Sequence, residues 1–228
     1  MKNIIVSNRK WNSKYIDIIA RKTGSEIFYI DNIDDLIYEN LKEINPNKIF
    51  FFHWSYIIPE KIYNSFECII FHMTDLPFGR GGSPLQNLIQ RGIYSTKISA
   101  LRCVKELDAG PIYMKKDLSL HGNAEEIYMR ASKVCCDMVI EIINNEVMPV
   151  AQNGEVTVFK RRKPTDSNIA ALDSLVSVYD YIRMLDADGY PHAFVEVGNL
   201  RFEFDRAALK DGFIEADVKI SIRELKEG

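Results

Sequence analysis

A histidine and an aspartate, 36 residues apart, are the side chains of this sequence best suited to move a proton. His72 follows the apolar run Glu67–Phe71 and opens a loop that contains three glycines. Asp108 stands in Leu107-Asp108-Ala109-Gly110-Pro111, which taken alone is ordinary turn sequence. A carboxylate beside an imidazole fixes its tautomer and stabilises the imidazolium that forms during proton transfer. Together the two positions indicate acid–base chemistry, whereas His72 alone fits equally well as an incidental residue of a glycine-rich turn.

The first 150 residues alternate apolar runs of strand length with helical patterns. Such continuous runs are typical of strands buried on both faces, and their alternation with helices indicates a Rossmann-like α/β domain with a mostly parallel sheet. In sheets of this kind ligands bind outside the carboxyl ends of the strands, where the loop after His72 should lie. We expect strands at residues 3–6, 26–30, 48–52, 67–71, 97–107 and 111–118, and helices that begin at Asn12, Asp34, Ser83-Pro84 and Asn123.

The pattern changes after residue 150. A basic cluster, Lys160-Arg161-Arg162-Lys163, precedes a helix that Asp173 would cap, and a Gly198-Asn199 turn predicts a β-hairpin. The cluster could meet a phosphate or simply be a solvated connection. We therefore expect a catalytic domain in residues 1–155 and a small C-terminal α+β accessory domain in residues 156–228, which is too small to bury much core alone.

Composition restricts the classes of partner. The chain has 29 Lys and Arg against 32 Asp and Glu, a net charge of −3, so no overall field attracts nucleic acid or an anionic membrane. The four cysteines show neither a CxxC pair nor zinc spacing, and the glycines match no phosphate-binding fingerprint. No segment is typical of a signal peptide or a membrane span. We expect a cytoplasmic protein with reduced thiols that binds no metal, nucleic acid or membrane, with a homodimer left open.

The order and spacing of these segments resemble the signature of the folate-dependent formyltransferases. His72, Leu76-Pro77, Arg80-Gly81 and Leu107–Gly110 match that family's loop motif and the Asp-x-Gly motif that follows it. The tail is similar to the accessory region of sugar-nucleotide N-formyltransferases and methionyl-tRNA formyltransferase. The amino-acid sequence of the loop looks most like that of enzymes acting on nucleotide-linked 4-amino-4,6-dideoxy sugars, the pseudaminic-acid pathway type among them.

The resemblance implies an N-formyltransferase with 10-formyltetrahydrofolate as its co-substrate. It implies as acceptor the amine of a UDP- or dTDP-linked 4-amino-4,6-dideoxyhexose, in surface-glycan or nonulosonic acid biosynthesis. His72 would stabilise the developing oxyanion or move a proton, and Asp108 would tune His72 or accept the proton of the amine. The donor would be bordered by Thr74, Asp75, Leu76, Pro77, Cys103, Val104 and Leu107. The acceptor would be bound by Asn8, Arg9, Lys10, Trp11, Gly81 and Tyr190.

One position departs from the family pattern. Ile70 stands two residues before His72, where the family usually has an asparagine whose amide helps to hold the oxyanion. A donor of that kind is typically worth ~3–4 kcal/mol, so His72, a backbone N–H or Asn8 would have to replace it.

Two other functions compete with the amino-sugar prediction. Methionyl-tRNA formylation is the nearest enzymatic alternative, which the acidic balance and the short tail disfavour because tRNA binding usually needs an extended basic face. A relative without activity that only binds nucleotide sugar or folate would explain Ile70, but the presence of both His72 and Asp108 argues against it.

Overall fold

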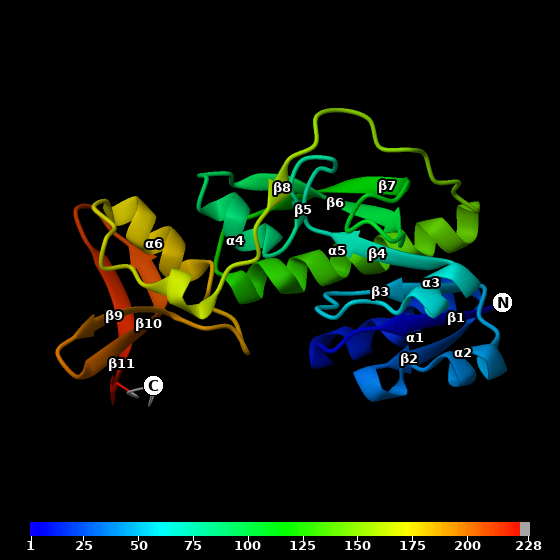
Figure 1. The fold of residues 1–228 in the computed structure, drawn as a ribbon, viewed down its shortest axis with the longest axis horizontal. Coiled ribbons are helices and arrows are strands. Elements are labelled where there is room, and N and C mark those ends of the chain that lie inside the picture. The colour runs from blue at the N-terminus through cyan, green and yellow to red at the C-terminus, as the bar shows by residue number, and fades with distance from the viewer. Residues whose placement is uncertain (224–228) are drawn as a thin grey trace. The chain divides into compact units, whose positions relative to one another are not determined.

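A computed structural model of the protein describes residues 1–223. Its central sheet has six strands in the order β2-β1-β3-β4-β6-β7 (Figure 1). The pairs β2–β1, β1–β3 and β3–β4 are parallel, and β4–β6 is antiparallel. The mostly parallel α/β sheet predicted from the sequence is therefore confirmed. The strands are β1 Lys2–Val6, β2 Glu26–Ile30, β3 Lys48–Phe51, β4 Cys68–His72, β6 Ser95–Arg102 and β7 Ile112–Ser119.

The apolar runs form the strands at the centre of the core. Ile4 in β1, Ile49 and Phe50 in β3, and Ile69 in β4 have no solvent exposure, as expected for strands covered on both faces. Because these runs occupy adjacent parallel strands, the carboxyl ends of β3 and β4 lie at the same edge of the sheet. The helices of this part of the chain are α1 Ile16–Thr23, α2 Tyr38–Ile44, α3 Glu60–Ser65, α4 Pro84–Ile89 and α5 Ala124–Asn145.

Helix starts agree less well with the predictions. Asn123 and Glu126 form the expected reciprocal cap of α5, with both hydrogen bonds at 2.9 Å. The helix predicted from Asn12 begins instead as a 3-10 turn over Lys10–Tyr15, and a second 3-10 turn, Ile33–Asp35, precedes α2. Ser83 makes no cap, because its backbone is left-handed with φ of 52° and its hydroxyl accepts the backbone N–H of Arg162.

The chain forms two compact units. The first contains residues 1–81, 96–118 and 129–158; the second contains residues 82–95, 119–128 and 159–228. Within the second unit the buried Arg183 guanidinium pairs with Asp180 at 2.7 Å and donates to the carbonyls of Leu120 and Gly122. The domain boundary predicted between residues 155 and 156 remains a prediction.

The second unit ends in a three-stranded antiparallel sheet in the order β11-β10-β9, drawn in orange and red in Figure 1. Its strands are β9 Ala193–Val197, β10 Leu200–Leu209 and β11 Ile214–Ile222, preceded by α6 Leu175–Arg183. Ser174, not Asp173, caps α6 by accepting the N–H of Ser177. The hairpin turns at Gly198-Asn199 as predicted, because Val197 pairs with Leu200. Along residues 1–223 no helix is both long and apolar enough to cross a bilayer.

Candidate active site

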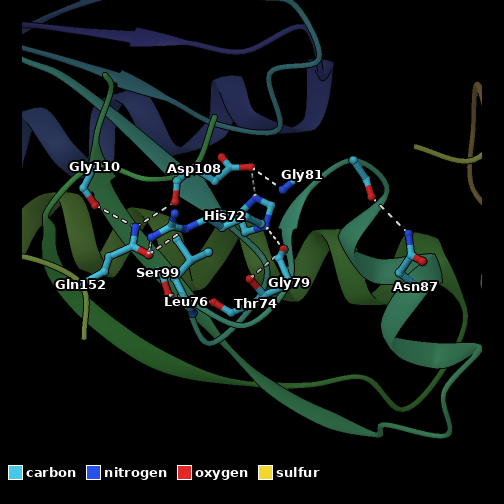
Figure 2. Close-up of polar contacts among 12 residues, drawn as sticks. His72, Thr74, Leu76, Gly79, Gly81, Asn87, Ser99, Asp108, Gly110 and Gln152 are labelled. Carbon is cyan, nitrogen blue, oxygen red and sulfur yellow. Dashed lines mark hydrogen bonds and ion pairs between the residues drawn. The ribbon is translucent and has the colours of Figure 1, made fainter. Parts of the chain in front are cut away.

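His72 ends β4 with its ring held between two acceptors (Figure 2). Its Nε2 lies 2.7 Å from the carbonyl oxygen of Gly79, and its Nδ1 lies 3.5 Å from Oδ2 of Asp108. A carbonyl can only accept, so Nε2 must carry a proton and Nδ1 is the nitrogen that faces the carboxylate. Both side chains are less than one tenth exposed. The two residues predicted to be catalytic therefore lie together in a largely desolvated place.

Asp108 lies on a turn that its neighbours hold in an unusual conformation. Its φ is 52°, a left-handed backbone that costs ~1–3 kcal/mol in a residue other than glycine. The backbone N–H of Gly81 donates to its Oδ2 at 2.9 Å. Gly110 completes the turn, and a Cβ added there would lie 1.8 Å from the carbonyl oxygen of Arg102. The Asp-x-Gly spacing is thus a steric requirement of the turn that presents the carboxylate.

The loop that follows β4 is held by one of its own polar side chains and by polar side chains of β6 and β7. Thr74 is fully buried and donates its hydroxyl to Gly79, while Ser99 donates to the Thr74 carbonyl at 2.7 Å. Lys115 of β7 lies 2.5 Å from both Oδ1 of Asp75 and the carbonyl oxygen of Leu76. These side chains stabilise the loop around His72. Their contact with a donor, like that of the half-buried Pro77, stays a prediction.

Gln152 is a site residue that sequence reasoning missed (Figure 2). Its amide N–H groups donate to the carbonyls of Asp108 and Gly110, both at 2.8 Å. Its Oε1 accepts two bonds from the guanidinium of Arg80, at 3.1 and 2.8 Å. Gln152 follows α5 in a segment with neither helical nor strand periodicity. Apart from its amide side chain, nothing in the local sequence indicated a role for this residue.

A cavity of about 230 Å³ opens beside the Asp108 turn. Cys103 and Val104 line it as the sequence suggested for the donor, whereas Leu107 is 65% exposed and is not among the lining residues. Burial, followed by the charge of Asp108, raises the pKa of Cys103 to about 11, so the thiol is protonated at neutral pH. The lining residues are Glu60, Tyr63, Asn64, Arg102, Cys103, Val104 and Lys105.

The loop after β1 is anchored through its tryptophan. Trp11 donates its indole N–H to the buried hydroxyl of Ser132 at 3.1 Å, and His53 contacts the same oxygen through Nε2 at 3.0 Å. The Arg9 guanidinium lies 5.5 Å from the Trp11 ring centroid. Lys10 is exposed. This packing gives Trp11 a structural role, and acceptor binding by Arg9, Lys10 and Trp11 remains a prediction.

Asn8 and Tyr190 are two further candidates for acceptor binding. Asn8 makes no hydrogen bond to His72 or Asp108 among the bonds of residues 1–223, and its Oδ1 is buried without a partner there. Tyr190, in the second unit, stacks on Tyr128 with ring centroids 5.3 Å apart.

Ile70 packs into the core. Its side chain is half-buried against the cluster that contains Ile4, Ile49 and Phe51, and its backbone pairs with Leu101 of β6.

The basic segment is fastened to the start of α4 within the second unit. Asn87 donates its side-chain amide to the carbonyls of Gly82, Ser83 and Lys160, at 3.1, 3.1 and 3.0 Å. A Cβ at Gly82 would lie 2.6 Å from the Cβ of Arg161, so only glycine allows this approach. The side chains of Lys160, Arg161 and Lys163 are exposed.

Comparison with known proteins gives consistent matches to one group of enzymes. The family model described as "Methionyl-tRNA formyltransferase, C-terminal domain" matches residues 164–221. Methionyl-tRNA formyltransferase from Mesoplasma florum is 29% identical over 207 residues, which cover 87% of this chain and 65% of that protein. The chain thus spans less than two thirds of the length of that curated relative.

Solved structures extend the comparison. A structure described as methionyl-tRNA formyltransferase from Clostridium thermocellum matches with a TM-score of 0.94 and 50% identity, covering 97% of this chain and 99% of that one. HypX from Aquifex aeolicus in complex with tetrahydrofolic acid matches with a TM-score of 0.75 and 17% identity, covering 91% of this chain and 38% of that one. The HypX match shows the fold alone.

These findings correct two expectations. The amino-sugar acceptor and the exclusion of nucleic acid as a partner were wrong, because the 50% identical structure and the 29% identical curated relative are both described as methionyl-tRNA formyltransferases. Sugar N-formyltransferases match only at the level of fold, with 17% identity. Net charge is an average over the whole surface, so a value of −3 does not exclude a nucleic acid as partner. With half of its residues identical to a solved formyltransferase along nearly its full length, the chain belongs to the formyltransferase family.

Proposed function

We propose that the protein transfers the formyl group of 10-formyltetrahydrofolate to the amino group of methionine carried on tRNA. The observation that carries this proposal is the desolvated His72–Asp108 pair, at 3.5 Å, in a chain 50% identical to a methionyl-tRNA formyltransferase structure. The cytoplasmic location expected from the sequence stays a prediction.

The pair suits an amine acceptor. The amine attacks the formyl carbon as a neutral group, so it must lose a proton while the leaving nitrogen of tetrahydrofolate gains one. Asp108 is a carboxylate that can accept the proton of the amine. His72 can stabilise the negative charge that develops on the formyl oxygen once its Nε2–H turns from the Gly79 carbonyl to the substrate, and exclusion of water strengthens that interaction. Since Ile70 cannot donate, His72, a backbone N–H or Asn8 would have to supply this bond.

The walls of the cavity beside the turn fit the donor. Tyr63, Cys103 and Val104 offer apolar surface for a flat ring, and the polar side chains that complete the lining, Glu60, Asn64, Arg102 and Lys105, can bind the polar groups of a pterin. Trp54, which packs on the same core cluster as Tyr63 and Cys103, has a buried indole N–H with no partner in residues 1–223. A buried donor without a partner is costly, so a ligand acceptor there would be favourable.

The basic segment fits the acceptor. Lys160, Arg161 and Lys163 are exposed and stand on backbone that Asn87 fastens to Gly82 and Ser83, directly after the Gly81 that contacts Asp108. Exposed cations suit the phosphates of a tRNA acceptor stem, because phosphate contacts fix the register of a nucleic acid.

The test is an assay of N-formylmethionyl-tRNA formed from 10-formyltetrahydrofolate and methionyl-tRNA. We expect turnover by the wild type and a raised KM for methionyl-tRNA in the triple variant Lys160→Ala, Arg161→Ala, Lys163→Ala. Each phosphate contact contributes ~0.7–0.9 to the slope of log affinity against log salt, so the triple variant should lose ~2–3 of that slope.

The matched control removes two lysines and one arginine elsewhere. Arg21→Ala, Lys22→Ala, Lys42→Ala lowers the net charge equally on the exposed sides of α1 and α2. It should leave KM and the salt slope close to wild type. The absence of any formylated methionyl-tRNA from a folded protein that binds the folate would reject the proposal.

A further inference from the structure

The segment between α5 and the basic cluster ties together the two loops that carry the catalytic pair. We refer to residues 150–157 as the strap. At one end the N–H and carbonyl of Val150 pair with those of Ile112, both at 2.8 Å. At the other end the Thr157 carbonyl accepts the N–H groups of Gly79 and Arg80, at 3.0 and 2.9 Å. The strap therefore reaches from the strand that follows the Asp108 turn to the loop that follows His72.

Gln152 connects the same two loops through its side chain. Its nitrogen donates to the carbonyls of Asp108 and Gly110, and its oxygen accepts from Arg80 (Figure 2). Both N–H groups and the oxygen of this amide are therefore used. Only an uncharged amide offers two donors and an acceptor in this arrangement.

The hydrogen bonds of Gln152 reach the residues that position His72 and Asp108. Arg80 lies between Gly79, whose carbonyl accepts from His72, and Gly81, whose N–H donates to Asp108. The Asp108 carbonyl that Gln152 holds belongs to the residue with left-handed backbone. A change at Gln152 would thus move the carboxylate relative to the imidazole from both sides.

We propose that Gln152 is a positioning residue that sets the distance between Asp108 and His72 by cross-linking their two loops. The proposal rests on the proposed function for its reaction. It assigns no contact of Gln152 with either substrate.

The first test measures formyl transfer by Gln152→Ala, Gln152→Glu and the control Asn153→Ala. Asn153 is the neighbouring amide on the strap, exposed and without a side-chain hydrogen bond in residues 1–223. We expect both Gln152 variants to lose at least ~10-fold in kcat, since small misplacement of reacting groups is that costly, with both KM values within ~3-fold of wild type. Gln152→Glu keeps an acceptor for Arg80 but loses the donors to the turn, so full activity in this variant would overturn the proposal.

A double-mutant cycle separates positioning from general damage. If Gln152 acts through Asp108, adding Gln152→Ala to Asp108→Ala should lower kcat by less than ~2-fold further. An equal loss in both backgrounds would indicate that Gln152 acts elsewhere and would reject the proposal.

A second measurement is independent of any substrate. Hydrogen exchange by NMR should show that Gln152→Ala reduces protection of the Gly81 amide, which donates to Asp108, by at least ~10-fold. The Ile112 amide, which is bonded to the strap at Val150, should change little and serves as the internal reference. Unchanged protection at Gly81, or an equal loss at both amides, would overturn the proposal. Failure of the wild type to formylate methionyl-tRNA would reject the proposed function while this measurement still decides the role of Gln152.

Discussion

Oδ2 of Asp108 is shared between the backbone N–H of Gly81, at 2.9 Å, and Nδ1 of His72, at 3.5 Å. The first distance is that of a full hydrogen bond and the second is slightly too long for one. Gly81 therefore holds the carboxylate in place while the imidazole keeps room to move toward it. Catalytic hydrogen bonds are often long in the absence of substrate and shorten in the reacting complex.

We predict that His72→Ala and Asp108→Ala each lower kcat for formyl transfer by at least ~100-fold, because general acid–base groups contribute that much or more. Circular dichroism and thermal melting should show that both variants remain folded. Near wild-type turnover in either variant would show that the catalytic pair has been assigned wrongly.

The alkylation rate of the Cys103 thiol should depend on the charge of Asp108. Because that charge contributes to the raised pKa of about 11, Asp108→Asn should lower the pKa and increase the thiolate fraction. We expect iodoacetamide to alkylate Cys103 several-fold faster in this variant at about pH 9. Peptide mass spectrometry measures the rate at each cysteine.

Cys136 is the matched control for that experiment. Its pKa is also raised to about 11, by burial and then by Asp137, so Asp108→Asn should leave its alkylation rate unchanged. Identical rates at Cys103 in the wild type and the variant would mean that Asp108 does not act on this thiol.

Gly110→Ala should damage the site through its backbone. The new Cβ would collide with the carbonyl oxygen of Arg102 at 1.8 Å, so the turn must shift and carry Asp108 with it. We expect a loss of ~10-fold or more in kcat, together with a lower Tm. The control Gly92→Ala has φ of 69° and no atom within 4 Å of the new Cβ, so it should cost ~1–2 kcal/mol of stability and leave kcat unchanged. Equal kcat in the two variants would contradict this explanation.

Glu67 should make stability depend on acidity. Burial acts to raise its pKa, but hydrogen bonds from Lys48 at 2.6 Å and Tyr113 at 2.8 Å outweigh it and hold the pKa below the ordinary 4.5. A lowered pKa in the folded state stabilises the protein above 4.5, and this contribution is lost as pH falls through the folded value.

We therefore expect the Tm difference between wild type and Glu67→Gln to shrink between about pH 7 and about pH 3. Glu43→Gln, at an exposed glutamate without an ion pair in residues 1–223, controls for removal of a charge. A Tm difference that does not vary with pH would show that ionisation of Glu67 does not contribute to the loss of stability in acid.

Trp11→Phe should lower the thermal stability of the protein and have little effect on the KM for the acceptor. Loss of the bond to Ser132 should cost ~1 kcal/mol, which corresponds to a Tm decrease of ~2–4 °C. Ser132→Ala combined with Trp11→Phe should cost less than the sum of the single changes, because one interaction is removed twice. A raised acceptor KM with an unchanged Tm would instead support the role in acceptor binding that the sequence suggested.

The sequence predicted the sheet correctly and indicated that His72 and Asp108 lie together, for a physical reason. Strands buried on both faces have continuous apolar runs, as in Lys48–Phe51, and a loop at the carboxyl end of such a strand is where a ligand can reach the backbone. The Asp108 turn has a local signature because only glycine fits at residue 110.

Other parts depend on contacts that no local pattern contains. Ser83 carries the residue type of a helix cap, but its hydroxyl bonds to Arg162, which is 79 residues later in the chain. The contacts of Gln152 could not be predicted for the same reason, since its partners are Arg80 and the Asp108 turn. The acceptor was predicted wrongly because the loop after His72 looked most like that of amino-sugar enzymes, and because the acidic balance and the short tail disfavoured tRNA, although net charge averages over the whole surface.

The strap also has a consequence for the order in which the protein matures during synthesis. His72 and Asp108 both leave the ribosome before residue 150, and so does the whole of α5. A nascent chain at that stage has both side chains and the direct contacts of Asp108 with Gly81 and His72, but it lacks the bonds that Gln152 and Thr157 make to the two loops. The segment that ties the two loops together is thus made after both of the side chains that it holds in place, and it contributes no acid or base of its own.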